Sequence, residues 1–166
     1  MKKIFLLGVS AILFIPVALL IDWAYYRDQK FLIPPISYSG EVPIRNDAYG
    51  NGHFEAPRKG KRKHKGLDIY APLHSEVAAS KGGRVKTGFV ENGLGKYVMI
   101  MHPEDYITLY GHLSEIAVKD KQRIRQGTVI GCVGKTGNAK YKNIKPHLHF
   151  EIRKRGEHLD PLLFLK

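Results

Sequence analysis

The sequence is nearly without cysteine, and this absence removes several classes of protein at once. Cys132 is the only cysteine among the 166 residues. An intramolecular disulfide, a cysteine-rich zinc finger and a thiol redox pair are therefore excluded. Cys132 lies in the apolar run 128–133, where we expect a buried and unreactive thiol rather than a nucleophile.

Sustained helical periodicity is also missing beyond the N-terminal stretch, and no internal repeat is visible. The 17 glycines and 9 prolines indicate many turns. Short runs of β-branched and aromatic residues alternate with these turns, which is typical of strands. The predicted fold class is mainly β, a compact antiparallel β-sheet domain preceded by an N-terminal transmembrane helix. The expected strands are residues 66–71, 83–90, 96–102, 106–113, 128–133 and 147–153.

Acidic residues are scarce relative to basic ones, since 15 Asp and Glu face 27 Lys and Arg and leave a net charge of +12. Such a chain is attracted to anionic partners, which include nucleic acid, a phospholipid surface and acidic cell-wall polymers. The basic cluster at residues 58–65 has little interleaved aromatic character, and a solvated loop is its simpler interpretation. We therefore expect no nucleic acid partner.

Charge is absent altogether from residues 4–21, an apolar run preceded by Lys2 and Lys3. A helix of this length spans about 27 Å, close to the thickness of a bilayer core. No small-residue cleavage site follows the run, and Trp23 and Tyr25 suit a membrane interface. We expect a single-pass anchor in the cell membrane, with a cleaved signal peptide as the alternative, and an exported domain on the periplasmic or extracellular face.

The chain accordingly divides into three parts. Residues 1–30 are the expected membrane anchor (or signal peptide) and its flank, residues 31–43 a linker, and residues 44–166 one folded domain. The linker is inferred from prolines and serines without periodicity. Turn residues at Asn92-Gly93 and at 102–105 predict that neighbouring strands pair antiparallel.

Histidines at two places in this domain have a spacing that suits a metal ion. His64 and Asp68 are four residues apart at the entry to an expected strand. In the alternating segment that follows Pro146, the side chains of His147, His149 and Glu151 share one face of a strand, and the apolar residues between them face the other way. We therefore expect this face of the strand to form the floor of a polar groove.

Catalytic zinc usually takes three protein ligands and keeps the fourth position for water. His112 lies at the end of another expected strand, so the domain has two histidines beyond the three residues that a catalytic zinc would need as ligands. Scattered surface histidines and a closed structural zinc are the alternatives. Glu151 either orients a ligand or is a solvated surface carboxylate.

The motifs around these residues resemble those of the lysostaphin and LytM type of zinc metalloendopeptidase, a family of peptidoglycan hydrolases. The resemblance covers most of residues 60–165 and consists of six ordered blocks, which together are far more specific than HxxxD alone. The blocks are His64-Lys65-Gly66-Leu67-Asp68, Asp68-Ile69-Tyr70-Ala71-Pro72, Tyr110-Gly111-His112-Leu113-Ser114, residues 126–131, residues 133–137 and Pro146-His147-Leu148-His149-Phe150-Glu151.

The resemblance implies a zinc metallopeptidase domain with one Zn²⁺ in an open groove. His64, Asp68 and His149 would be the metal ligands, and His112 and His147 would be catalytic. As a hypothesis, His147 takes or orients the proton of the attacking water and His112 donates to the oxyanion, with the two roles exchangeable.

The implied function is a zinc-dependent endopeptidase that hydrolyses stem or cross-bridge peptide bonds in bacterial peptidoglycan. The alternative is a non-catalytic wall-binding module that activates another peptidoglycan hydrolase, and a protein regulator of unknown identity is conceivable. The basic loop 138–145 is longer than the family pattern, and we expect it beside the groove. Residues in the segment 41–57 are candidates for a fourth ligand, namely Asn46, Asp47, Asn51 and His53.

Overall fold

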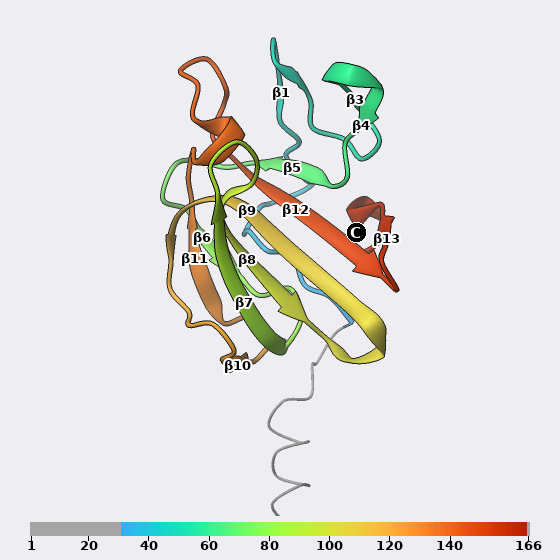
Figure 1. The fold of residues 1–166 in the computed structure, drawn as a ribbon, viewed down its shortest axis with the longest axis vertical. Coiled ribbons are helices and arrows are strands. Elements are labelled where there is room, and N and C mark those ends of the chain that lie inside the picture. The colour runs from blue at the N-terminus through green and yellow to red at the C-terminus, as the bar shows by residue number, and fades with distance from the viewer. Residues whose placement is uncertain (1–30, 166) are drawn as a thin grey trace, which may run out of the picture.

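The computed structural model describes residues 31–165, which form an antiparallel β domain (Figure 1). The predicted anchor at residues 1–30 lies outside the described residues. Within residues 31–165 we find no helix with the length and apolar character needed to span a membrane. The strands are β1 (Asn46–Asp47), β2 (Gly50–Asn51), β3 (Pro57–Arg58), β4 (Arg62–Lys63), β5 (Leu67–Tyr70), β6 (Glu76–Ala78), β7 (Gly83–Val90), β8 (Gly95–Met101), β9 (Tyr106–Ile116), β10 (Arg123–Ile124), β11 (Val129–Val133), β12 (His147–Lys154) and β13 (Glu157–Leu159).

The six strands expected from the sequence are all present, as β5, β7, β8, β9, β11 and β12. The predicted hairpins pair antiparallel, β7 with β8 and β8 with β9. The strands that the sequence analysis missed are two or three residues long, too short to display a period. Short 3₁₀ turns connect some strands, and they are η1 (Lys59–Lys61), η2 (Pro103–Asp105), η3 (Gly137–Ala139) and η4 (Pro161–Leu163).

Strand β9 is the centre of the main sheet, which has nine strands. Along one edge it pairs with β8. Along its other edge residues 106–111 pair with β12, and residues further on pair with β11. Strand β12 in turn pairs with β5, so that three strands far apart in the sequence lie side by side (Figure 1).

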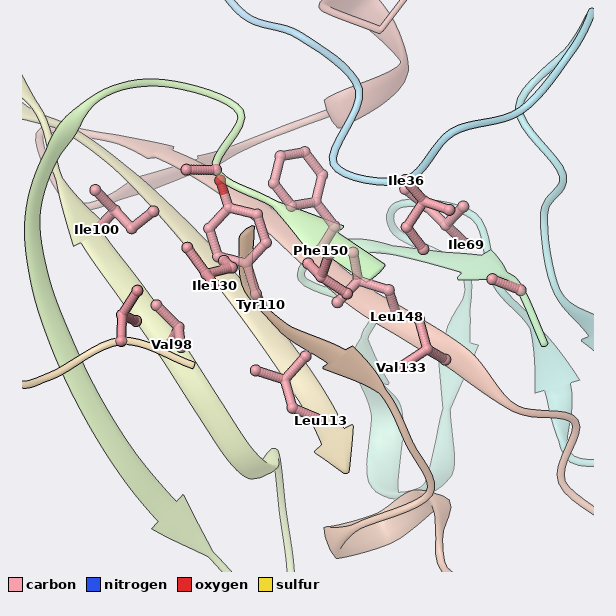
Figure 2. Close-up of a cluster of buried hydrophobic side chains, with 14 of the residues drawn as sticks. Ile36, Ile69, Val98, Ile100, Tyr110, Leu113, Ile130, Val133, Leu148 and Phe150 are labelled. Carbon is pink, nitrogen blue, oxygen red and sulfur yellow. The ribbon is translucent and has the colours of Figure 1, made fainter. Parts of the chain in front are cut away.

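The hydrophobic core lies on one face of β5, β9 and β12 (Figure 2). Leu67 and Ile69 point into it from β5, and Leu148 and Phe150 from β12. The Phe150 ring lies 5.3 Å from that of Tyr110, centroid to centroid. Burying each such side chain contributes roughly 1.5–3 kcal/mol. Because strand side chains alternate, anchoring these residues in the core turns Asp68, His147 and His149 to the opposite face.

Residues 31–43, expected as a linker, pack against the domain. Ile36 is 5% exposed and belongs to the core. The Ile33 amide donates to the Ser80 carbonyl, and the Pro35 carbonyl accepts from the Ala78 amide. The segment lacks regular structure, which is why periodicity gave no sign of its packing. The division of the chain at residues 30 and 43 stays a prediction.

Cys132 is partly exposed, so the expectation of a buried thiol was wrong. A shift of register in the pairing of β11 with β9 falls between Cys132 and Val133, and it breaks the alternation that an apolar run suggests. The thiol donates to Glu115 Oε1 at 3.0 Å. This hydrogen bond, together with partial burial and the carboxylate charge, raises the pKa of Cys132 to about 11, which keeps the thiol unreactive.

Two glycines join the start of β8 to the turn η3, close to the strand ends that carry the candidate site. Gly95 and Gly137 both have left-handed backbone, with φ of +64° and +63°. A Cβ on Gly137 would overlap the backbone of Gly95 and Gly93. Gly156 also has a positive φ, +86°, but a Cβ there meets nothing within 4 Å.

Placing alanine in a left-handed conformation costs about 1–2 kcal/mol. We predict that Gly137→Ala lowers the free energy of unfolding by well over this amount, because the neighbouring backbone must also move. Gly156→Ala is the matched control, and its free energy of unfolding should fall only by the cost of the left-handed conformation. Urea denaturation of both variants measures the difference. Equal losses would show that the close approach at Gly137 adds nothing.

Candidate metal centre

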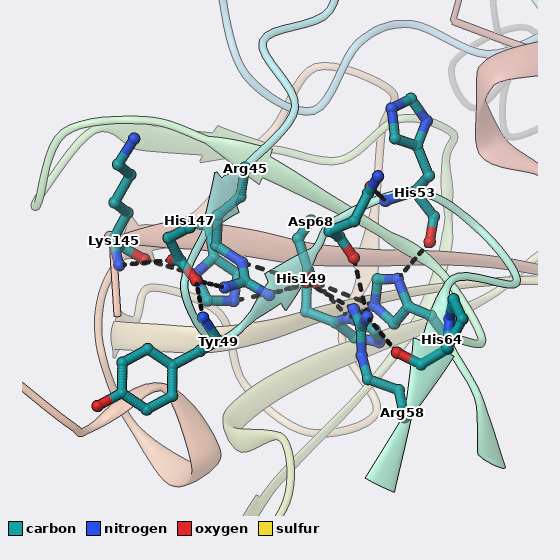
Figure 3. Close-up of polar contacts among 12 residues, drawn as sticks. Arg45, Tyr49, His53, Arg58, His64, Asp68, Lys145, His147 and His149 are labelled. Carbon is teal, nitrogen blue, oxygen red and sulfur yellow. Dashed lines mark hydrogen bonds and ion pairs between the residues drawn. The ribbon is translucent and has the colours of Figure 1, made fainter. Parts of the chain in front are cut away.

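The strand register brings the candidate ligands together. In the pairing of β12 with β5, His149 lies opposite Asp68, and in the pairing of β12 with β9 it lies opposite Gly111, the neighbour of His112. His64 stands just before β5, where its amide donates to the Ala56 carbonyl. The side chains of His64, Asp68 and His149 extend toward one point on the polar face (Figure 3).

Three ligand atoms form a nearly equilateral triangle. His64 Nε2 lies 3.0 Å from Asp68 Oδ1 and 3.0 Å from His149 Nδ1, and the last two atoms are 2.9 Å apart. Tetrahedral zinc with bonds of about 2.0–2.1 Å separates its ligand atoms by about 3.4 Å. Small side-chain shifts would therefore bring all three atoms within bonding distance of one zinc ion, as a set of three protein ligands.

The proton positions also suit a cation. His64 Nδ1 donates to the His53 carbonyl at 2.8 Å, which leaves the lone pair of the neutral ring on Nε2, inside the triangle. His149 contacts a carboxylate with each nitrogen, Asp68 through Nδ1 and Glu151 through Nε2. A bound metal would replace the Nδ1 proton that His149 shares with Asp68.

Charge pairing in this buried cluster shifts its pKa values. Burial by itself lowers the pKa of His149, but its hydrogen bonds to Asp68 and Glu151 raise it to about 9. For Asp68, burial favours the neutral acid, yet the hydrogen bond from His149 holds the pKa well below its usual value. The carboxylate is therefore charged and ready to bind a cation.

Glu151 is buried against His149, a candidate ligand, so the interpretation as a solvated surface carboxylate was wrong. It is 3% exposed, and its Oε1 lies 3.0 Å from His149 Nε2. Its other oxygen accepts two hydrogen bonds from Arg153, at 2.8 and 2.6 Å. Burial raises its pKa, but the bond to His149 and the charge of Arg153 bring it down to about 2. The ring plane of His149 is fixed by this charged pair.

His112 and His147 lie beside the triangle, with ring centroids 4.9 Å apart. His112 Nδ1 donates to the Thr136 carbonyl at 2.9 Å, and His147 Nδ1 donates to the Lys145 carbonyl at 2.7 Å. His147 Nε2 is 3.9 Å from Asp68 Oδ1. Burial lowers the pKa of His112 to about 3 and that of His147 to about 4, so that both rings are neutral.

The backbone at His112 is unusual. Its φ is +62°, a left-handed value that is costly for a residue with a side chain. It lies where the pairing of β9 passes from β12 to β11, and its amide donates to the Leu94 carbonyl at 2.7 Å. The surrounding strands therefore hold His112 in a strained conformation beside the triangle.

The sequence analysis missed two arginines at the site. Arg45 and Arg58 both donate to Asp68 Oδ2, the oxygen that faces away from the triangle. Arg45 precedes a two-residue strand and Arg58 lies in a basic cluster that suggested a solvated loop, so neither pattern indicated a buried contact. Of the candidates for a fourth ligand, Asp47 and His53 are not among the converging ligand atoms found within residues 31–165. Asn46 and Asn51 stay predictions.

The sequence profile of peptidase family M23 matches residues 62–161. Among curated proteins, the peptidoglycan DD-endopeptidase ShyC of Vibrio cholerae is 37% identical over 100 residues, which are 60% of this chain and 22% of that protein. The murein hydrolase activator NlpD of Escherichia coli is 33% identical over 102 residues, 61% of this chain and 26% of that protein.

The fold is also similar to that of solved proteins. The catalytic domain of lysostaphin from Staphylococcus simulans superposes with a TM-score of 0.58 at 26% identity, covering 72% of this chain and 90% of the other. The chain spans only between 21% and 39% of the length of the curated relatives that it matches. The resemblance stated from the motifs is confirmed.

Replacing His149 with alanine should abolish zinc retention, because it removes one of three ligands. His112→Ala should keep the metal, since His112 is not one of the three candidate ligands. His74→Asn is a control on an exposed histidine whose left-handed backbone asparagine tolerates. Zinc content of the purified variants distinguishes them, and a His149→Ala protein that keeps stoichiometric zinc would contradict the ligand assignment.

Glu151→Gln should weaken zinc binding by about tenfold, the lower end of what loss of an outer partner of a ligand costs. The amide is nearly isosteric but does not carry the charge that holds the His149 Nε2 proton. Arg153→Ala, which leaves the carboxylate in place, should have a smaller effect. Competition with a chromophoric chelator gives both affinities, and an unchanged affinity in Glu151→Gln would rule out the role of Glu151.

Proposed function

The chain belongs to peptidase family M23, and from this premise we propose that it is a zinc-dependent endopeptidase that hydrolyses stem or cross-bridge peptide bonds in bacterial peptidoglycan. The observation that carries the proposal is the convergence of His64, Asp68 and His149, with two further histidines beside them. The similarity to a DD-endopeptidase and to lysostaphin supports the choice of substrate.

The ligand set fits zinc, since two imidazole nitrogens and one carboxylate oxygen are ligands that zinc favours and one position stays open. A zinc ion held there supplies Lewis acidity, which polarises a carbonyl and lowers the pKa of water. The chain's own residues do the rest: they fix the ligands, orient the substrate and move protons.

His112 and His147 are the proposed proton carriers. Each keeps its proton at Nδ1, on a carbonyl oxygen, so each offers an unprotonated Nε2 toward the site. One of them accepts the proton of the attacking water and later returns it to the leaving amine. His112 could donate to the oxyanion only after its Nε2 had gained a proton, so each ring starts as a possible base and the two roles stay exchangeable.

A non-catalytic activator is the second candidate function, because a relative with 33% identity carries the name of a murein hydrolase activator. Retention of all three ligand atoms and both flanking histidines favours the enzyme. We further propose that the domain works on the outer side of the cell membrane, tethered by the apolar residues 4–21.

Purified peptidoglycan should be cleared by the full chain, and the clearing should stop when a chelator removes zinc and return when zinc is restored. Mass analysis of released muropeptides would identify the bond. His112→Ala, which keeps its metal, should lose at least about 100-fold in rate, as removal of a proton carrier does. Binding to the wall without clearing, in a protein loaded with zinc, would instead support the activator.

A further inference from the structure

The two oxygens of Asp68 have different partners. Oδ1 belongs to the ligand triangle. Oδ2 accepts hydrogen bonds from Arg45, through Nε at 3.3 Å and Nη2 at 3.0 Å, and from Arg58 Nη2 at 3.2 Å. The carboxylate is thereby held with one oxygen toward the metal position and the other toward guanidinium groups (Figure 3).

Arg45 is the more strongly constrained of the two arginines. Its side chain is 6% exposed, against 22% for Arg58. Its remaining nitrogen, Nη1, donates to Asp47 Oδ1 at 2.8 Å. Its backbone is fixed as well, because the Arg45 amide donates to the Asp68 carbonyl and the Arg45 carbonyl accepts from the Gly52 amide. A planar guanidinium held between two carboxylates has little freedom to turn.

Asp47 extends this contact to the other side of the site. Its Oδ2 accepts from the Lys145 amide at 3.1 Å. The Lys145 carbonyl in turn accepts from His147 Nδ1 at 2.7 Å. An unbroken chain of hydrogen bonds therefore runs from the ligand Asp68 through Arg45 and Asp47 to the residue that orients His147.

We propose that Arg45 and Asp47 are positioning residues, a brace that sets the carboxylate of the metal ligand Asp68 at one end and the ring of His147 at the other. The inference rests on the zinc site of the proposed function. The brace depends on the shape of the guanidinium group as well as on its charge. A lysine at position 45 keeps the charge but has a single ammonium group, so it cannot hold Asp68 and Asp47 together.

The first test compares zinc binding by Arg45→Lys and by the wild type. Competition with a chromophoric chelator should show affinity reduced by roughly 10- to 100-fold, the usual effect of losing an outer partner of a ligand. The visible spectrum of the Co²⁺-substituted protein should change, because the carboxylate no longer presents one fixed oxygen. Arg58→Ala should lose less, and Lys63→Ala, which removes an exposed pair with Glu55, should match the wild type.

The second test uses Asp47→Asn, which keeps the size of the side chain but has only one acceptor oxygen. In the wild type one oxygen accepts from Arg45 and from the Tyr49 amide, and the other accepts from the Lys145 amide. Zinc affinity should stay within about threefold of the wild type, because Arg45 still reaches Asp68, whereas kcat on soluble muropeptides should fall by roughly tenfold with KM little changed. This variant also serves if Arg45→Lys does not fold, which circular dichroism of the zinc-loaded protein reveals.

The outcomes separate the two proposals. If the wild type neither holds zinc nor cleaves muropeptides, the proposed function fails. If the wild type does both but Arg45→Lys keeps its zinc affinity and its Co²⁺ spectrum, the brace at Asp68 is overturned. If Asp47→Asn keeps full kcat, the link to His147 is overturned.

Discussion

The register of β12 between β5 and β9 is the constraint on which the site depends. His149 is opposite Asp68 on one side and opposite Gly111 on the other. A slip of one residue in either pairing would turn the histidines into the core and Phe150 toward solvent. Burial of the apolar face therefore specifies the position of the polar face, and the metal ligands are placed by packing that occurs on the other side of the same strands.

The polar face carries charges that are buried, and these are stable only because they are paired. Asp68 is satisfied by His149 and two arginines, and Glu151 by His149 and Arg153. Removing one member of such a buried pair costs about 3–5 kcal/mol, because it leaves an uncompensated charge. The cluster is preorganised for a cation, since its carboxylates are ionised and one of the ligand nitrogens already has its lone pair inside the triangle.

The sequence was informative where a local pattern of residues is compatible with only one kind of structure. Alternation in residues 147–152 identified a strand with one polar face, and the spacing of His64 and Asp68 indicated two side chains that the structure places in one candidate metal cluster. Arg45 could not be found in this way. Its role depends on a backbone contact with β5 across 23 residues, and a lone arginine before a two-residue strand has no period to read. The packing of Ile36 against the core was missed for the same reason.

The long basic loop 138–145 does not disturb His112 and His147, because the residues at its two ends are held in place. Just before it, the Thr136 carbonyl accepts from His112 Nδ1, and at its far end the Lys145 carbonyl accepts from His147 Nδ1. The chain between these two anchors makes neither contact, so its length can change while both rings keep their orientation, at a small cost in loop entropy. The anchors are themselves secured, Lys145 by Asp47 and Thr136 by a hydrogen bond to the Leu113 carbonyl. Variation in the loop therefore changes what lies beside the candidate metal centre without altering the orientation of His112 and His147.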